Sequence, residues 1–254
     1  MKQLVAIYSA ELLKLKRTIA FLLTILIPVL LIILIIFMVL DRGLENYNKE
    51  MFNHLLNFTF SIWPMIVMPM FLSIATGLIG SMETTTGQWK HIFCLPIPKW
   101  KILFTKWLAI ITLTFVSHAQ VVLLFLGSFP IIQLFVPQVS YIPFMDTLDF
   151  LWFLIILCVA SVGLTSIHFV FSLIFPGLVG NIGLGISAVT LSMGLTWAGN
   201  FFQFFPWTVP LAALANFVEL DTSFMPITAM LISLITAIIW LLPGIRLFSR
   251  KDIL

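Results

Sequence analysis

Few side chains in this sequence have the types and spacing that chemistry requires. The four histidines lie far apart in the chain, at His54, His91, His118 and His168, so they do not form the clustered set of ligands that binds a metal. The sequence contains no glycine-rich phosphate loop, no G-x-S-x-G elbow and no H-E-x-x-H pair. We therefore expect no metal, no cofactor bound by this chain and no catalysis by this chain alone.

The segment from 83 to 101 is the richest in candidate functional residues. Its apolar residues between Gln88 and Leu95 can form one side of a short amphipathic helix, which Pro96 and Pro98 would stop. Such a helix can present an apolar knob to a soluble partner, or it can rest its rings on lipid headgroups. Composition alone leaves both interpretations open. The candidate residues of this segment are Glu83, Trp89, Lys90, His91, Phe93 and Leu95.

The elements that position these residues must lie in a membrane. Of the 254 residues, 61% are apolar and 9% are charged, and the mean hydropathy is +1.15. Charge-free runs of about 18 residues or more indicate transmembrane helices. A water-soluble enzyme is excluded, and an outer-membrane barrel is disfavoured because both faces of each run are apolar. The expected fold class is an all-α integral membrane protein.

The apolar runs predict six transmembrane helices in a single domain, 1–254. An amphipathic, interfacial helix is expected over 1–17. Pro64 and Pro69 predict a kink in the second span. The six spans are expected at about 18–40, 58–80, 103–127, 150–175, 180–199 and 226–245.

The distribution of charge predicts the orientation of the spans. With both termini in the cytoplasm, most Lys and Arg residues fall in inside segments and most acids fall outside, as the positive-inside rule requires. No charge is expected in the interior of the spans, and no internal repeat is evident, which disfavours an ion-coupled transporter. The inside segment between the second and third spans is then the one that holds Trp89.

Two sets of polar or small residues in the spans have a structural and a functional interpretation. A stripe on the fifth span would let another helix approach closely, and we favour packing within the subunit over a dimer seam. Polar residues in the third and fourth spans are expected to make packing hydrogen bonds more than to bind ligands. The stripe consists of Gly180, Gly183, Ser187, Thr190 and Gly194. The polar residues are Ser117, His118, Gln120, Thr165, Ser166 and His168.

The loop between the second and third spans resembles that of a known family. Glu83, Gly87-x-Trp89-Lys90, Leu95-Pro96-Ile97, Lys99 and Lys106 together resemble the loop of ABC-2 family permeases, the membrane subunits of ATP-binding-cassette exporters. The basic N-terminal helix, the six spans and the stretch from Phe205-Pro206-Trp207 to Ala215 are also similar to that family. The size and the T-T-G-Q-W-K-H loop look most like permeases of lantibiotic and bacitracin immunity and export.

The resemblance implies a coupling helix at about Thr84 to Leu95, seated in a cleft of a separate ATPase subunit. Trp89, His91 and Phe93 would be its contact residues. Glu83 would pair with a basic residue of the N-terminal helix or relay motion, and the alternative is an ordinary solvated carboxylate. ATP and Mg would be bound by the partner ATPase, and a second copy or a sister permease would complete a dimer.

An aromatic segment precedes the last span and is too apolar for a freely solvated loop. It resembles the re-entrant external helices of the family, which would line an exit path, and the alternative is an aromatic belt at the outer interface. Its candidate residues are Phe201, Phe202, Phe204, Phe205 and Trp207.

The expected function is that of a permease subunit in the bacterial cytoplasmic membrane. It would export a hydrophobic or amphipathic substrate, with an antimicrobial or other peptide as the expected cargo, and so confer self-immunity and antimicrobial resistance. The alternatives are a drug or lipid exporter on the same scaffold and, from another class, a membrane anchor or assembly factor that transports nothing. No nucleic-acid partner is needed to explain the basic charge.

Overall fold

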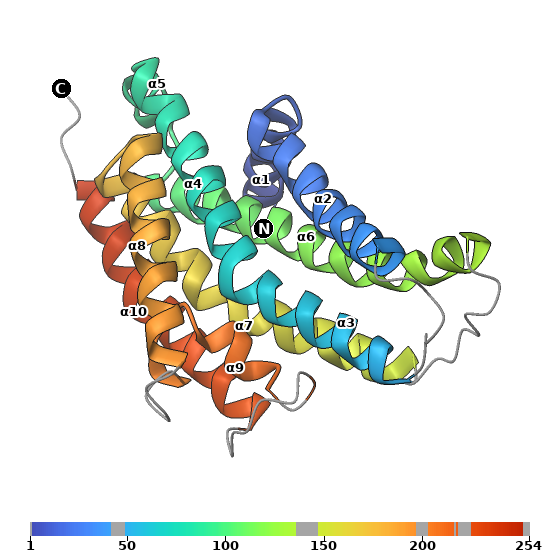
Figure 1. Cartoon of the computed structure of the whole chain (residues 1–254). Coiled ribbons are helices and arrows are strands. Elements are labelled where there is room, and N and C mark those ends of the chain that lie inside the picture. The colour runs from blue at the N-terminus through green and yellow to red at the C-terminus, as the bar shows by residue number, and fades with distance from the viewer. Residues whose placement is uncertain are drawn as a thin grey trace.

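The computed structural model describes residues 2–41, 49–135, 147–196, 203–215, 217 and 225–250. All regular secondary structure in these residues is helical, and the long helices pack side by side (Figure 1). The elements are α1 (Lys2–Leu15), α2 (Ile19–Asp41), α3 (Lys49–Ile62), the π-helical turn η2 (Trp63–Val67), α4 (Met68–Thr85), α5 (Gln88–Phe93), α6 (Lys99–Phe135), α7 (Thr147–Ile174), α8 (Leu178–Thr196), α9 (Val209–Ala213) and α10 (Pro226–Arg250).

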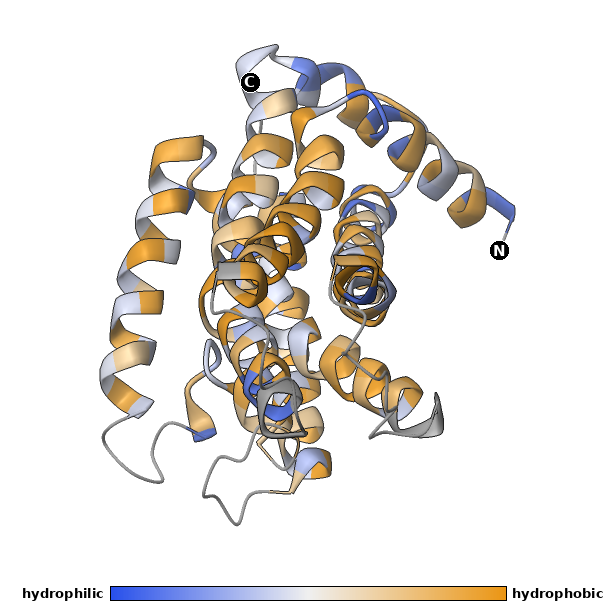
Figure 2. Ribbon diagram, turned by 45° about the vertical axis from the view of Figure 1, so that its right-hand side comes forward, coloured by the Kyte–Doolittle hydropathy of each residue, from blue (hydrophilic) through white to orange (hydrophobic). Residues whose placement is uncertain are grey.

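Among the described residues, six helical segments are long and apolar enough to cross a membrane, in agreement with the expected number of spans. Figure 2 shows hydrophobic residues along the long helices and hydrophilic stretches on the N-terminal helix. The second and third spans extend well beyond their predicted bounds, because helical structure continues past the apolar runs on which the prediction rested. The segments are Ile19–Leu40, Asn53–Thr85, Lys99–Phe135, Phe150–Ile174, Leu178–Thr196 and Pro226–Arg250.

The second span contains a π-helical turn where prolines predicted a kink. Pro69 has no N–H to donate, and its ring would clash with the carbonyl of Met65 in a regular α-helix. The backbone N–H of Met68 instead bonds to the carbonyl of Trp63, five residues earlier. Figure 1 shows that the helix changes direction between α3 and α4. The turn also places the buried indole of Trp63 toward α6.

Glycines allow two pairs of helices to approach closely. A Cβ on Gly163 of α7 would lie 2.6 Å from the carbonyl oxygen of Ser233 in α10, and the Ser233 hydroxyl accepts a hydrogen bond from the Gly163 N–H at 2.8 Å. A Cβ on Gly185 of α8 would lie 2.8 Å from the Cβ of Ser73 in α4. Within a lipid bilayer the hydrophobic effect does not drive helices together, so close backbone contact of this kind is what lets them associate.

The N-terminal helix α1 packs along the first half of α6. The Tyr8 hydroxyl and the Thr112 hydroxyl lie 2.6 Å apart, and Lys101 donates a hydrogen bond to the side chain of Gln3 at 2.8 Å. Val5 and Leu13 remain exposed on the other side of α1. This arrangement fixes α1 beside the end of the bundle at which α5 lies.

Candidate functional site

The candidate site is the short helix α5 and the helix ends that hold it. Gly87 links α4 to α5 with φ of 66°, a left-handed conformation that glycine adopts without a Cβ penalty. After α5, Pro96 and Pro98 interrupt the helical structure before α6 begins at Lys99. A helix is thus present within the predicted range, but it is shorter, Gln88–Phe93.

Trp89 anchors α5 to the bundle. Its side chain is only 5% exposed, its indole N–H donates to the Thr84 hydroxyl at 3.1 Å, and its ring meets Phe248 of α10 edge-on at 5.1 Å between centroids. A residue with these contacts is not available to a partner. The expectation that Trp89 touches an ATPase is therefore wrong for this structure, and its role here is to fix α5.

The exposed residues of α5 and of the turn that follows it include Gln88, Lys90, His91 and Leu95. Leu95 is 50% exposed although it is apolar. Phe93 is half-buried, and the ammonium of Lys99 lies 4.8 Å from its ring centroid. Of the predicted contact residues, His91 is thus accessible, Phe93 partly so and Trp89 not at all.

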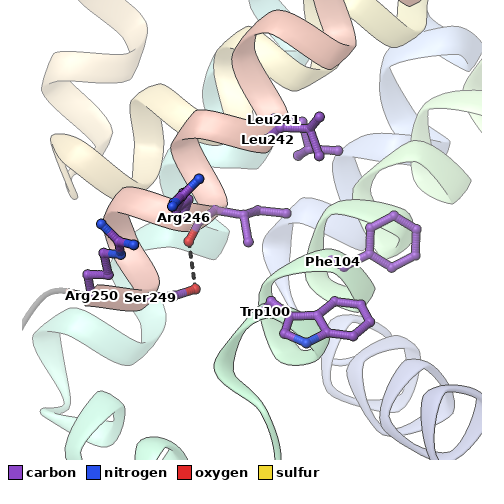
Figure 3. Close-up of a pocket in the computed structure, with 8 residues that line it drawn as sticks. Trp100, Phe104, Leu241, Leu242, Arg246, Ser249 and Arg250 are labelled. Atoms are coloured by element: carbon purple, nitrogen blue, oxygen red, sulfur yellow. Dashed lines mark hydrogen bonds between the residues drawn. The ribbon is translucent and has the colours of Figure 1, made fainter.

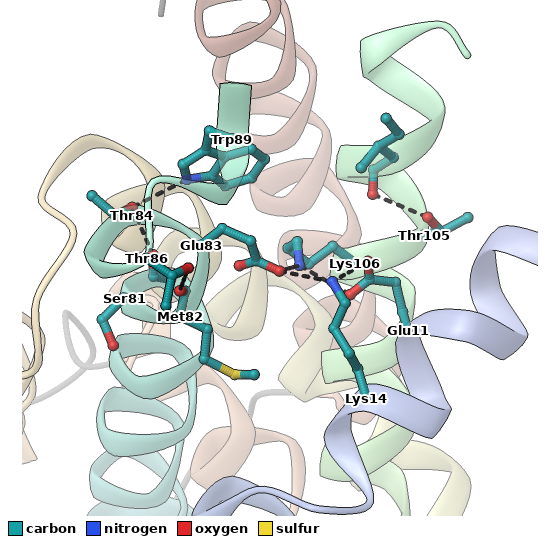
Figure 4. A network of polar contacts seen from close by, with 12 residues as sticks. Glu11, Lys14, Ser81, Met82, Glu83, Thr84, Thr86, Trp89, Thr105 and Lys106 are labelled. Atoms are coloured by element: carbon teal, nitrogen blue, oxygen red, sulfur yellow. Dashed lines mark hydrogen bonds and ion pairs between the residues drawn. The ribbon is translucent and has the colours of Figure 1, made fainter. Parts of the chain in front are cut away.

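A cluster of four charged residues joins α1, α4 and α6 directly beneath Trp89 (Figure 4). Lys106 donates to Glu83 Oε1 at 2.6 Å, and Lys14 donates to the same oxygen at 3.0 Å. Lys106 also donates to Glu11 Oε2 at 2.9 Å, and Lys14 to Glu11 Oε1 at 3.2 Å. The two acids and two bases balance in charge, which permits the burial of Glu11, Glu83 and Lys106, while Lys14 remains partly exposed.

The burial of this cluster settles the alternatives for Glu83. Its side chain is 1% exposed and that of Lys106 is 2% exposed, so the solvated-carboxylate interpretation is wrong and the pairing with the N-terminal helix is confirmed. Both residues lie toward the ends of candidate spans, Asn53–Thr85 and Lys99–Phe135, so the middle of these spans carries no charge, as expected. Burial disfavours the charged form of Lys14, but the carboxylates of Glu11 and Glu83 outweigh it and raise the pKa of Lys14.

The sequence interpretation missed Glu11 and Lys106 as members of the site. A signal for Glu11 was present, because it shares the helical face of Leu4, Tyr8 and Leu15, where an unpaired acid would not be expected. Lys106 carries a comparable signal, since it lies seven residues inside α6 among apolar neighbours. A carboxylate on one apolar face and an ammonium on another indicate that the faces meet.

The arrangement makes α5 and three helix ends mechanically one unit. Glu83 of α4 and Lys106 of α6 flank α5 in the chain, and the ammonium of Lys106 lies 5.8 Å from the Trp89 ring centroid. Contacts of Trp89 and Glu83 thus connect α5 with α4 and α6. Contacts of Lys14 and Glu11 connect α1 with them.

The polar residues of the spans make packing hydrogen bonds, with one exception. The indole of Trp63 donates to His118 Nδ1 at 3.0 Å, and His118 Nε2 lies 3.1 Å from the Ser161 hydroxyl. The indole of Trp107 donates to Ser166 at 3.0 Å. Ser117 and Thr165 bond to backbone carbonyls. Gln120 is the exception, since its Oε1 is buried without a partner.

The small-residue stripe of α8 faces away from the subunit. Gly180, Gly183, Ser187, Thr190 and Gly194 are all exposed, and a Cβ on any of the three glycines would meet no described atom within 4 Å. The face of α8 that packs on α4 is a different one and carries Asn181 and Gly185. Our preference for packing of the stripe within the subunit is therefore wrong, because helix rotation places it outward.

The aromatic segment is divided between the interior and the surface. Trp207 is buried and donates its indole N–H to His168 Nε2 of α7 at 3.1 Å, whereas Phe204 is 63% exposed. Phe205 stacks on Trp207 at 5.3 Å between centroids. Phe201 and Phe202 lie outside the described residues. The segment thus turns into the bundle at Trp207, which an aromatic belt alone does not explain.

The fold and this site define a class of protein. Six apolar spans and a short helix held at one end by a buried charge cluster belong to a multi-pass membrane protein. Residues 7–146, more than half of the chain, match the family model described as ABC-2 family transporter protein, so the chain belongs to this family. It is a permease subunit of an ABC transporter, and it associates with an ABC ATPase. A comparison with curated proteins returns no match.

Proposed function

We propose that this permease is the membrane subunit of an ATP-driven exporter, and that α5 is its coupling helix. The observation that carries the proposal is the contrast within α5 and the turn that follows it. Trp89 is packed into the bundle, while Lys90 and His91 of α5 and Leu95 of the turn are exposed. An element that is rigid toward the spans and open toward solvent suits the transmission of motion from a partner. Closure of the partner ATPase would then move α4, α6 and α1 together.

The orientation of the subunit follows from the distribution of basic residues. The described end that carries α5 holds Lys14, Lys90, Lys99, Lys101 and Arg250, among others, and an excess of such residues favours the cytoplasmic side. We therefore place α5 and both termini in the cytoplasm of a bacterial cell. A cytoplasmic α5 is also what a soluble ATPase requires, since ATP and Mg would be bound there.

The outward face of α2 supports a hydrophobic or amphipathic cargo. On α2, Leu22, Leu26, Leu30 and Phe37 form an exposed apolar stripe. We propose an antimicrobial or similar peptide as cargo, exported or expelled in self-immunity as by lantibiotic and bacitracin permeases, and a drug or lipid as the alternative.

The stripe of α8 is proposed as a contact with a second permease copy or a sister permease. It is long, small and uncovered within the subunit, so a helix of another chain can approach it closely. A dimer of this kind would pair two coupling helices with two ATPases. The segment around Trp207 would then lie beside the exit path.

The test is a double substitution on the open side of α5, His91→Ala with Leu95→Ala, in permease copurified with its ATPase and placed in lipid vesicles. We expect cargo-stimulated ATP hydrolysis and cargo transport to fall together, while the spans remain folded because neither side chain is buried. The control is Lys16→Ala with Arg17→Ala, which are exposed after α1. Unchanged coupling in the α5 variant would reject α5 as the coupling helix.

The same vesicles distinguish a transporter from an anchor. Peptide, drug and lipid cargoes are offered in turn to the wild-type complex, and movement across the membrane is measured with and without ATP. ATP-dependent movement toward the side opposite the ATPase supports export, and the class of cargo that moves decides the substrate. A complex that holds the ATPase but moves none of them would favour the anchor or assembly factor.

A further inference from the structure

A groove between α6 and α10 lies at the same end of the molecule as α5 and takes no part in the charge cluster. It encloses about 580 Å³, within the range of ligand-binding pockets. Figure 3 shows Trp100 and Phe104 on one side of it and the last turns of α10 on the other. The residues that line it are Trp100, Phe104, Leu241, Leu242, Ile245, Arg246, Ser249 and Arg250.

Both walls of the groove change from polar to apolar in the same direction. Because α6 begins at Lys99 and α10 ends at Arg250, the helix ends meet at the mouth of the groove. Trp100 lies one turn nearer the mouth than Phe104, and Arg250 and Arg246 lie nearer than Leu242. An indole at the interface with a phenyl ring and leucines below it is the pattern of a headgroup boundary.

The positive charge at the mouth has no counter-charge within the described part of the chain. Every ion pair there belongs to the cluster of Glu11, Lys14, Glu83 and Lys106. Arg246 and Arg250 are exposed and are four residues apart, so both guanidinium groups project from one face of α10. Two planar guanidinium groups side by side suit the oxygens of a phosphate.

We infer that this groove binds an anionic phospholipid, with its headgroup phosphate between Arg246 and Arg250 and an acyl chain along Phe104 and Leu242. The amphipathic walls and the unpaired cations together match this one class of molecule. Basic pockets between transmembrane helices on the cytoplasmic side bind anionic headgroups. The inference rests on the chain spanning a membrane with this end on the cytoplasmic side, as proposed above, and it does not depend on ATP-driven export.

The test compares lipids that share acyl chains but differ in charge. Purified permease with its ATPase, in mild detergent, is titrated with dioleoylphosphatidylglycerol, dioleoylphosphatidylcholine and glycerol 1-phosphate, and bound species are counted by native mass spectrometry. We expect the anionic lipid to bind more tightly than the zwitterionic lipid. We expect glycerol 1-phosphate, which lacks the chains, to bind far more weakly than either.

Variants of groove residues test whether the lipid binds in the groove. Arg246→Gln with Arg250→Gln should weaken phosphatidylglycerol binding roughly 30-fold and phosphatidylcholine binding less, because the choline cation already offsets the charge of its phosphate. Lys16→Gln with Arg17→Gln removes equal charge elsewhere and should weaken phosphatidylglycerol binding much less. Ser249→Trp keeps both arginines and fills the groove between them and Trp100, so it should also abolish tight binding, with the melting temperature as the check on folding.

Three results would overturn the inference. One is equal affinity for the anionic and zwitterionic lipids, and another is a loss in the arginine variant no larger than in the lysine and arginine control. The third is glycerol 1-phosphate binding as tightly as phosphatidylglycerol, which would show a free-phosphate site with no role for the apolar walls.

Discussion

At the scale of single residues, the stability of the site depends strongly on one oxygen atom of Glu83, which two ammonium groups share. Glu83 Oε1 accepts from two ammonium groups, while its Oε2 is buried without a partner. Such a group is stable only while its charge partners remain, because a buried unpaired charge costs several kcal/mol. The cluster therefore holds α1, α4 and α6 together mainly because separating its charges would leave buried charges unpaired, and less because the net attraction between them is large.

The first prediction concerns the removal of one partner. Lys106→Met should destabilise the permease by about 3–5 kcal/mol, because Glu83 and Glu11 then lose their buried counter-charge. Adding Glu83→Gln removes one of the two stranded charges and should restore part of that loss. Thermal unfolding in detergent measures both. A double variant as unstable as Lys106→Met alone would show that lost packing, and not stranded charge, causes the effect.

Gly87 provides a second residue-scale prediction. At φ of 66° a β-branched side chain is strained by about 1–2 kcal/mol, whereas asparagine tolerates this conformation. Nothing lies within 4 Å of a Cβ there, so backbone strain is the sole difference. Gly87→Val should lower cargo-stimulated ATP hydrolysis and Gly87→Asn should retain most of it. Equal activities would mean that the turn does not set the pose of α5.

At the scale of elements, α8 has two small-residue faces with different roles. Gly185→Val would place methyl groups against Ser73 and should lower the stability of the subunit. Gly183→Val projects outward, so it should leave subunit stability unchanged and weaken self-association. Melting temperature and native mass measure the two effects separately. If the Gly183→Val variant forms dimers as the wild type does, the dimer interface lies on another face of the subunit.

The elements also show what the sequence can and cannot predict. The six spans followed from composition, because lipid requires a continuous apolar run. Their rotation did not follow, since the rotation of α8 depends on which glycine meets Ser73, a contact between residues far apart in the chain. Trp89 was correctly placed in the α5 segment, but its burial depends on Phe248 of α10. A motif thus predicts where a residue lies along the chain and not which neighbour covers it.

At the scale of the whole molecule, charge asymmetry predicts the orientation. Native Cys94 is exposed beside α5, and Cys158 is half-buried in α7, so one thiol reports the exposure of the α5 end. A membrane-impermeant maleimide should label Cys94 in inside-out vesicles and not in intact cells. Cys94→Ser should abolish that labelling. Labelling of intact cells at Cys94 would invert the proposed topology.

The charge cluster also has a consequence for biosynthesis. Glu83 leaves the ribosome before Lys106. Until Lys106 follows, the Glu83 carboxylate can pair only with the N-terminal helix when it reaches the membrane boundary. We therefore expect the insertion machinery to hold α4 until α6 arrives, since Glu83 becomes cheap to bury only when Lys106 is present. The contacts that we propose to transmit motion in the mature permease would then also couple the integration of these two helices.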